Sequence, residues 1–446
     1  MKVTNILFTI MLGVALIGAS AQDPIQLEAE RGGADNRIPV AIPVFPTDVA
    51  TLKYGDALAK IMARDFAFEG EFVIVPETEY PARFRGLPSD FSKINFENWR
   101  VTRAEHLVHT TLRQEGNQMV AESRLFDILT SQQVVGKKLS ADTAKEARLM
   151  AHMFADESVR FLTGVPGIAT TEIAFSGAKG KGTVKEIYIA DYDGGTLTQV
   201  THHGALSIRP EFSPDGTRIA YLSYKDRFPF LYVYDRRTGK STPLSTRSGL
   251  NHAPAWSPDS RKIALTLSKD GNTEIYIKNP DGSGEQRLTN DRGSDTSPTF
   301  SPDGRQIAFV TDRAGRPQIY VMNVDGSNPH RISYQGGSSY DPAYSPDGRY
   351  IAYIVEKSGE GLELYIMNTD GSSPRQLSFS GGSNESPSWS PDSRHVMFGS
   401  SRGGNSQLYT ATLSTGVIQI VPNLNHMKCE GATWGPRRLA SQTAVR

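Results

Sequence analysis

The chain of 446 residues lacks several features that mark particular classes of protein. It has one cysteine, Cys429, so no disulfide bond can form within it, and we expect this side chain to be packed rather than reactive. The formal net charge is zero and lysine and arginine do not cluster, which argues against a nucleic-acid partner. After residue 21, no apolar run reaches the roughly 20 residues of a membrane-spanning helix.

The first 21 residues differ in composition from the rest. Lys2 precedes an apolar run over residues 6–17, and Ala19-Ser20-Ala21 supplies the small residues of a signal-peptidase site. A membrane anchor is the alternative, but this run is too short to span a bilayer. We predict a secretory signal peptide over residues 1–21, cleaved after Ala21, and an exported mature chain without a transmembrane segment.

One phrase, Ser-Pro-Asp-Gly or Ser-Pro-Asp-Ser, recurs with a nearly constant period. Successive copies begin 44, 44, 44 and 45 residues apart, and a last step of 45 reaches a degenerate copy, Gly435-Pro436. Periods of roughly 40–50 residues are typical of a β-propeller with one four-stranded blade per repeat. Because Pro, Asp and Gly suit a tight turn, we interpret the phrase as structural rather than as a repeated site. The five full copies begin at Ser213, Ser257, Ser301, Ser345 and Ser390.

The two ends of the repeat region predict how the ring closes. Residues 172–202 carry the last three strands of a blade, whereas residues 430–436 supply a first strand with nothing after it. We therefore predict a six-bladed propeller over residues 166–436, with a joining blade of three N-terminal strands and one C-terminal strand. This 3+1 closure leaves no open sheet edge, and the alternative, an open solenoid, would need capping repeats. A tail over residues 437–446 has no assigned role.

Residues 22–165 lack the repeat and predict a small α/β domain, so the fold class is a two-domain chain whose second domain is all-β. Its N-terminal tail, residues 22–37, is polar and contains an alternating patch, Ile25-Gln26-Leu27-Glu28. The tail is either a frayed terminus or a segment that adds a strand to a partner's sheet. The predicted elements are strands at 40–45 and 72–75, helices at 53–66 and 144–162, helix or strand segments at 96–101, 106–112 and 119–127, a hairpin turn at Gly116-Asn117 and a linker at 164–167.

Motifs of common enzymes are missing. The chain has no Gly-x-Ser-x-Gly nucleophile elbow and no glycine-rich nucleotide loop. His106 and His109 lack partners at metal-ligand spacing, and Asp191-Tyr192-Asp193-Gly194 lacks the later glutamate of a calcium loop. We expect no catalytic residue, metal or cofactor. A propeller-containing hydrolase and a small-ligand sensor remain the alternatives.

Recognition is expected at one face of the propeller. The segments before the first strands and those between second and third strands share this face, and they vary between repeats. They contain Asp, Glu, Arg and His, so they form a polar mouth suited to a protein loop or a charged ligand. A polar mouth is also what an ordinary solvated face looks like.

The signal peptide, the small α/β domain and the six Pro-x-aromatic-Ser-Pro-Asp-Gly repeats together resemble the TolB family, the periplasmic propellers of the Tol-Pal system with WD40-like (PD40) repeats. The resemblance covers essentially the whole mature chain. It implies a non-enzymatic adaptor that supports outer-membrane integrity and envelope constriction during cell division. It also implies two partners: the peptidoglycan-associated lipoprotein Pal, and the C-terminal domain of TolA. Other outer-membrane lipoproteins are further candidates.

The resemblance places Pal at the propeller mouth and TolA at the mature N-terminus. In this sequence the TolA segment maps to the tail, with Ile25, Leu27, Glu28 and Arg31 as its contact residues. The residues that map to the Pal site, together with the same positions of two further repeats, are Leu250, Asn251, His252, Ala253, Asp295, Thr296, Tyr340, Asp341 and Glu385.

Overall fold

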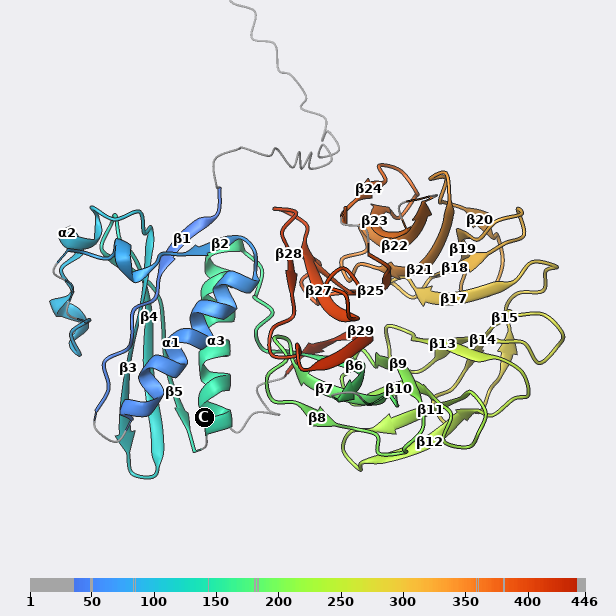
Figure 1. Cartoon of the computed structure of the whole chain (residues 1–446), viewed down its shortest axis with the longest axis horizontal. Helices are drawn as coiled ribbons and strands as arrows, with labels where there is room; N and C mark the ends of the chain where they lie inside the picture. Colours follow the sequence, from blue (N-terminus) through green and yellow to red (C-terminus); the bar gives the residue numbers. More distant parts are fainter. Residues whose placement is uncertain are drawn as a thin grey trace, which may run out of the picture.

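The computed structural model describes residues 36–438, except 49–50, 83, 85, 143, 180–181, 183, 358, 360 and 380–381. The predicted cleavage site at Ala21 and the four predicted TolA-contact residues lie outside this part of the chain. An α/β domain and a disc of β-sheets lie side by side (Figure 1). No helix among the described residues is long and apolar enough to cross a membrane.

The α/β domain contains a five-stranded sheet in the order β2-β1-β3-β4-β5. Strand β1 runs parallel to both of its neighbours, and β3, β4 and β5 form an antiparallel meander. The predicted hairpin turn at Gly116-Asn117 is confirmed, whereas β5 was not predicted. The strands are β1 (Ile38–Ala41), β2 (Phe72–Ile74), β3 (His106–Glu115), β4 (Gln118–Asp127) and β5 (Gln132–Ala141).

Two long helices cover the face of this sheet that is turned toward the propeller (Figure 1). They are α1 (Leu52–Phe68) and α3 (Ala144–Thr163), close to the two predicted helices. Residues four apart along α1, Leu58, Met62 and Phe66, are at most 3% exposed, because this spacing puts them on one helix face. The opposite sheet face carries the short helices η1 (Glu77–Glu79), η2 (Phe91–Lys93) and α2 (Phe96–Trp99).

Five blades of the propeller are continuous in sequence, each with four antiparallel strands. The third strand of each of these blades carries a central tyrosine, and Tyr276 and Tyr365, for example, pack against residues of the preceding blade. Three blades are β9 (Ser207–Phe212), β10 (Arg218–Ser223), β11 (Phe230–Asp235) and β12 (Lys240–Ser245); β13 (Asn251–Trp256), β14 (Ile263–Leu267), β15 (Glu274–Lys278) and β16 (Gln286–Arg287); β17 (Asp295–Phe300), β18 (Gln306–Thr311), β19 (Gln318–Asn323) and β20 (His330–Arg331). The other two are β21 (Ser338–Tyr344), β22 (Tyr350–Lys357), β23 (Gly361–Asn368) and β24 (Arg375–Gln376); β25 (Asn384–Trp389), β26 (His395–Ser400), β27 (Gln407–Thr412) and β28 (Ile418–Ile420).

The sixth blade joins the two ends of the propeller and confirms the 3+1 closure. Its strand order is β29-β6-β7-β8, and the innermost strand, β29 (Met427–Arg437), comes from the far end of the chain. Within β29, Cys429 is buried and Trp434 is 7% exposed, and the Trp434 indole donates a hydrogen bond to Thr171 Oγ1 at 2.8 Å. The remaining strands are β6 (Thr171–Lys179), β7 (Glu186–Asp191) and β8 (Thr198–Gln199).

The repeated Ser-Pro-Asp phrase forms the turn between the first and second strands of each of the five continuous blades. In one copy, Ser257 Oγ donates to Asp259 Oδ1 at 2.6 Å, and the same carboxylate accepts the backbone N–H of Arg261. The fourth residue has a positive φ, +69° at Gly216 and +59° at Ser260, so the serine there bears strain that glycine avoids. Ser260 also accepts the backbone N–H of Asp215 from the neighbouring blade, so the turns hold blades together as a structural role requires.

Replacing Trp434 tests the closure. We expect Trp434→Ala to lower the free energy of unfolding by about 3–5 kcal/mol, because a large buried side chain and its hydrogen bond to Thr171 are lost at the seam. Urea unfolding measures the change. Val101→Ala, at a side chain 83% exposed, should change the same quantity by less than about 0.5 kcal/mol. An equal effect of both substitutions would contradict a seam held by β29.

Candidate functional site at the propeller mouth

The six innermost strands share one pattern of burial where they reach one face of the propeller. We call this face the mouth; it is formed by the segments before the first strands and those between the second and third strands. A buried residue is followed by two partly exposed residues and then, in five of the six strands, by a buried proline; in β29 the last two positions are a buried glycine and an alanine. The third residue of this pattern has a left-handed backbone conformation in all six strands. The strand pairing shifts register around it. A β-bulge therefore occurs at the same place in all six blades. The left-handed residues are Arg209, Ala253, Ser297, Asp341, Ser386 and Gly431, with φ between +46° and +54°.

This pattern corrects the prediction that the nine Pal-site residues lie in segments that precede the first strands. Except for Leu250, which immediately precedes β13, they lie inside the strands. In sequence, a polar residue before proline indicates a turn, because proline removes a donor and restricts its neighbour. A bulge accommodates both restrictions without ending the strand.

A cavity of about 240 Å³ lies where the six innermost strands converge, and all six contribute to its lining. Arg209 Nη1 approaches Asp341 Oδ1 at 3.4 Å, so the two side chains join β9 to β21. Asp341 also accepts from Ser297 Oγ at 3.3 Å and, through Oδ2, from the Ser386 backbone N–H at 3.4 Å. Burial tends to raise the pKa of Asp341, but Arg209, His252 and the Ser386 N–H together outweigh it and hold this pKa below its usual value. The carboxylate thus ties four blades together.

Other charged groups surround this cavity at the mouth. Glu430 forms an ion pair with Lys185, which lies just before β7. Burial and the nearby Glu430 raise the pKa of Glu385. Burial, helped by Arg209, lowers the pKa of His252 to about 4, so this ring is neutral at pH 7. The mouth therefore combines paired charges with one neutral histidine.

The predicted Pal-site residues fall into two groups. Asn251 and Asp295 are fully buried, Asn251 accepting from Ser245 Oγ at 2.7 Å and Asp295 pairing with Arg313 at 2.8 Å. Asn251 thus joins β13 to β12 of the preceding blade and Asp295 braces its own blade, so neither buried side chain can touch a docked partner. The remaining seven are at least partly exposed at the mouth: Leu250, His252, Ala253, Thr296, Tyr340, Asp341 and Glu385.

Three charged residues of the mouth, Arg209, Glu430 and Lys185, were not predicted as site residues. Arg209 and Glu430 occupy the same repeat positions as Asp341 and Glu385, so aligning the six first strands could have found them. Lys185 lies outside those strands and no repeat position marks it.

The mouth face also carries most of the exposed large apolar side chains of the propeller. Of eight such residues among the described part of this domain, six lie in segments that open on this face. Single exposed apolar residues are common on soluble proteins, but in this propeller most of them gather on one face. These apolar rim residues are Val184, Tyr224, Phe228, Leu250, Tyr334 and Phe379.

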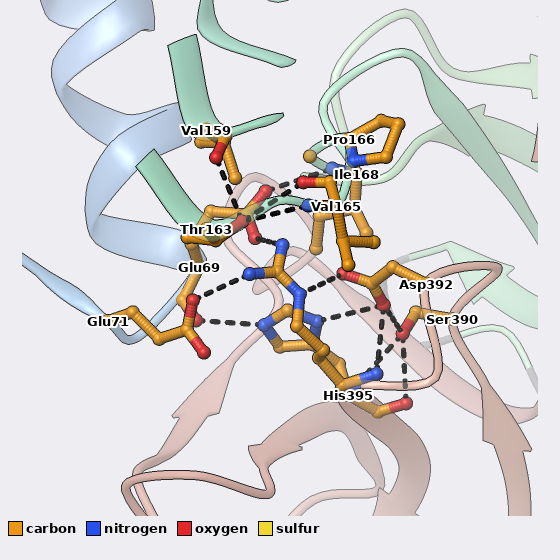
Figure 2. A network of polar contacts seen from close by, with 12 residues as sticks. Glu69, Glu71, Val159, Thr163, Val165, Pro166, Ile168, Ser390, Asp392 and His395 are labelled. Carbon is orange, nitrogen blue, oxygen red and sulfur yellow. Dashed lines mark hydrogen bonds and ion pairs between the residues drawn. The ribbon is translucent and has the colours of Figure 1, made fainter. Parts of the chain in front are cut away.

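A second polar cluster lies on the opposite face, where the α/β domain contacts the propeller. Figure 2 shows Glu69 and Glu71, just after α1, facing Asp392 and His395 of the propeller. Arg394 lies among the carboxylates, with nitrogen–oxygen distances of 2.7 Å to Glu69, 2.6 Å to Glu71 and 2.9 Å to Asp392. An arginine whose side chain is only 15% exposed and has three carboxylate partners holds the two domains in one arrangement.

Further contacts extend this interface to the sixth blade. Arg148 of α3 pairs with Asp191 at 2.9 Å and with Asp193 at 2.6 Å, in the turn that follows β7. Tyr192 of the same turn donates to Asp65 Oδ1 at 2.7 Å. The sequence Asp191-Tyr192-Asp193-Gly194, which resembles a calcium loop, therefore serves domain docking.

Glu69, Asp392 and His395 bring possible metal-ligand atoms within 4.8 Å of one another. Each of these atoms already has a protein partner. Glu69 accepts from Ile168 N–H and Arg394, Asp392 accepts from Ser390 and Arg394, and both His395 nitrogens face oxygens. A cation here would have to displace Arg394, so the cluster is a docking contact.

Two family models match the chain. One, described as the TolB beta propeller domain, matches residues 159–361 and 336–438, and the other, described as the TolB amino-terminal domain, matches residues 30–134. The crystal structure of TolB from Acinetobacter baumannii superposes with a TM-score of 0.80 at 25% identity, covering 90% of this chain and 97% of that one.

Among curated proteins, the Tol-Pal system protein TolB of Ruegeria sp. (strain TM1040) is 33% identical over 235 residues, which is 50% of this chain and 52% of that protein. The Tol-Pal system protein TolB of Methylobacillus flagellatus is 32% identical over 225 residues, 50% of each chain. The chain thus spans about half the length of the curated relatives it matches.

Replacing Arg394 tests the docking contact. We expect Arg394→Ala to cost about 3–5 kcal/mol, because Glu69 and Asp392 would be left buried without their cation. Thermal and urea unfolding measure the loss. The matched control is Arg349→Ala, at the same repeat position, whose side chain is 64% exposed and should matter by less than about 1 kcal/mol. Equal losses would contradict a special role for Arg394.

Proposed function

The chain belongs to the TolB family, and on that premise we propose that it is a non-enzymatic adaptor of the Tol-Pal system in the periplasm. In this proposal the mouth binds the lipoprotein Pal, and the tail over residues 22–37 binds the C-terminal domain of TolA. The adaptor thereby supports outer-membrane integrity and the inward growth of the envelope during division.

The observation that carries the proposal is the composition of the mouth face. Six exposed apolar side chains surround a centre of paired charges that includes Arg209, Asp341 and Glu430. Protein interfaces combine apolar anchors with a polar complement in this way. The α/β domain contacts turns on the opposite face, so a partner can reach the mouth while the two domains stay docked.

The geometry of the mouth favours a protein partner over the two alternative functions, a small-ligand sensor and a hydrolase. The central cavity, about 240 Å³, is smaller than the roughly 300–1,000 Å³ of typical small-molecule pockets, which argues against a small-molecule ligand bound in this cavity. Two of the three charged residues that line it, Arg209 and Asp341, pair with each other across blades rather than with a nucleophile. That arrangement supports a binding surface more than the catalytic pocket of a hydrolase.

A bulky cation at the mouth tests Pal docking. Thr296→Arg should weaken binding of Pal at least about tenfold, because the long charged side chain would occupy the contact surface. Isothermal titration with purified Pal measures the affinity. Thr238→Arg, in an exposed turn on the opposite face, is the matched control and should bind normally. Tight binding by both variants would refute docking at the mouth.

Removing part of the tail tests TolA binding. A mature chain that begins at residue 36 should lose binding to the C-terminal domain of TolA and keep binding to Pal, because the two sites are separate in this proposal. Pull-down with each partner gives the result. A chain that ends at residue 438 loses the other terminal segment and serves as the control. Retained TolA binding after the N-terminal deletion would exclude the tail as its site.

A further inference from the structure

His395 lies at the docking contact in a position that only its protonated form satisfies. Nε2 faces the backbone carbonyl oxygen of Glu69 at 2.9 Å, and Nδ1 faces Asp392 Oδ1 at 3.4 Å. A neutral imidazole has one N–H, so one of these two oxygens would meet a lone pair. The imidazolium donates to both. One of the two acceptors belongs to the α/β domain and the other to the propeller.

We propose that docking of the α/β domain onto the propeller is linked to proton uptake at the contact between His395 and Glu69, so that the interface tightens as the pH falls and loosens above neutrality. The proposal concerns the arrangement of the two domains and does not depend on Pal or TolA.

The charge balance of the contact supports this inference. The end of α1 contributes the carboxylates of Glu69 and Glu71, the turn between β25 and β26 contributes Asp392 and the Arg394 guanidinium, and α3 contributes Asp156 close to Glu69. Trp434 of β29 covers the His395 ring with its own, at a centroid distance of 6.2 Å. Four carboxyl groups thus share one permanent cation. A buried cluster with excess negative charge favours protonation of its titratable members.

The directions of the pKa shifts agree with this balance. Burial lowers the pKa of His395, but Asp392 and Glu69 outweigh it, and the result is a pKa above the usual value. Burial raises the pKa of Glu69 to about 8, although His395 and Arg394 oppose the rise. The pKa of Asp392 is lowered by His395 and Arg394 despite burial.

The sign of the pH effect follows from these shifts. The stabilisation from His395 is complete below its undocked pKa of about 6.5 and is lost as the pH rises through the docked value. Glu69 acts in the same direction, because burial raises the pKa of its carboxyl group in the docked form above the ordinary value of about 4.5. Asp392 acts oppositely, but only in strong acid, where its carboxylate becomes protonated. Docking therefore weakens as the pH rises above about 4.5, through Glu69, and more steeply above about 6.5, where His395 adds its own proton.

Direct titration of the ring is the first measurement. In protein with ¹³C-labelled histidine, the signal that disappears in His395→Gln belongs to His395, and NMR gives its pKa. We expect a value above 6.5 in the intact chain. A value at or below 6.5 would overturn the proposal.

A variant that wedges the interface supplies the second measurement. A Cβ at Gly70 would come within 3.0 Å of Thr412 Cβ and closer still to its hydroxyl, so Gly70→Ala should push the α/β domain off β27. The matched control is Gly86→Ala, which has the same kind of positive φ, +108°, but no atom within 4 Å of the new Cβ. Gly70→Ala should lower the pKa of His395, and Gly86→Ala should leave it unchanged.

Small-angle X-ray scattering at pH 6 and pH 8.5 then reports docking itself. For Gly70→Ala we expect a compact particle at pH 6 and a more extended one at pH 8.5, with an opening constant that rises up to about tenfold per pH unit for each proton released. Adding His395→Gln to Gly70→Ala should make the opening constant less dependent on pH, because one proton fewer is released on opening. An unchanged dependence in the double variant, or an opening constant that does not vary with pH, would refute the linkage.

Discussion

The pairing of β29 with β6 is the interaction on which the rest of the structure depends. It brings the last described strand of the chain into the sixth blade and places six innermost strands around one axis. The mouth exists only because these strands converge, and the Arg209–Asp341 contact spans the ring that the pairing closes. The α/β domain contacts the sixth blade, which contains the seam, and the neighbouring blade β25–β28. Near the seam, Arg437 of β29 donates hydrogen bonds to the linker carbonyls of Pro166 and Gly167. Closure, docking and linker are one connected region.

The repeated features of the propeller maintain its fold, whereas the copies that differ make contacts outside it. The Ser-Pro-Asp turn recurs because each blade needs the same connection, and in four full copies its contacts serve the propeller alone. In the fifth, the two following residues, Arg394 and His395, reach into the α/β domain. The mouth shows the same principle: five bulges share a proline, whereas the side chains beside them differ from blade to blade.

Much of the fold could be predicted from the sequence, because the period and the unmatched ends are properties of the chain alone. Strand β5 was missed because it is a half-exposed edge strand with two lysines and no clear alternation. The bulges were taken for loops because local proline signals do not reveal strand pairing. Burial of Asn251 and Asp295 depends on partners elsewhere in the chain, Ser245 and Arg313. The docking contact could not be predicted, since it joins residues more than 300 positions apart.

The six bulges have a consequence for how such a surface can diversify. Backbone shape there is fixed by the left-handed residue and the pairing around it, while the residue just before it is only partly buried. Those six positions resemble the variable loop positions that an antibody framework carries: their side chains can be exchanged while the scaffold stays the same. One propeller architecture could then acquire new specificities by rewriting Ile208, His252, Thr296, Tyr340, Glu385 and Glu430.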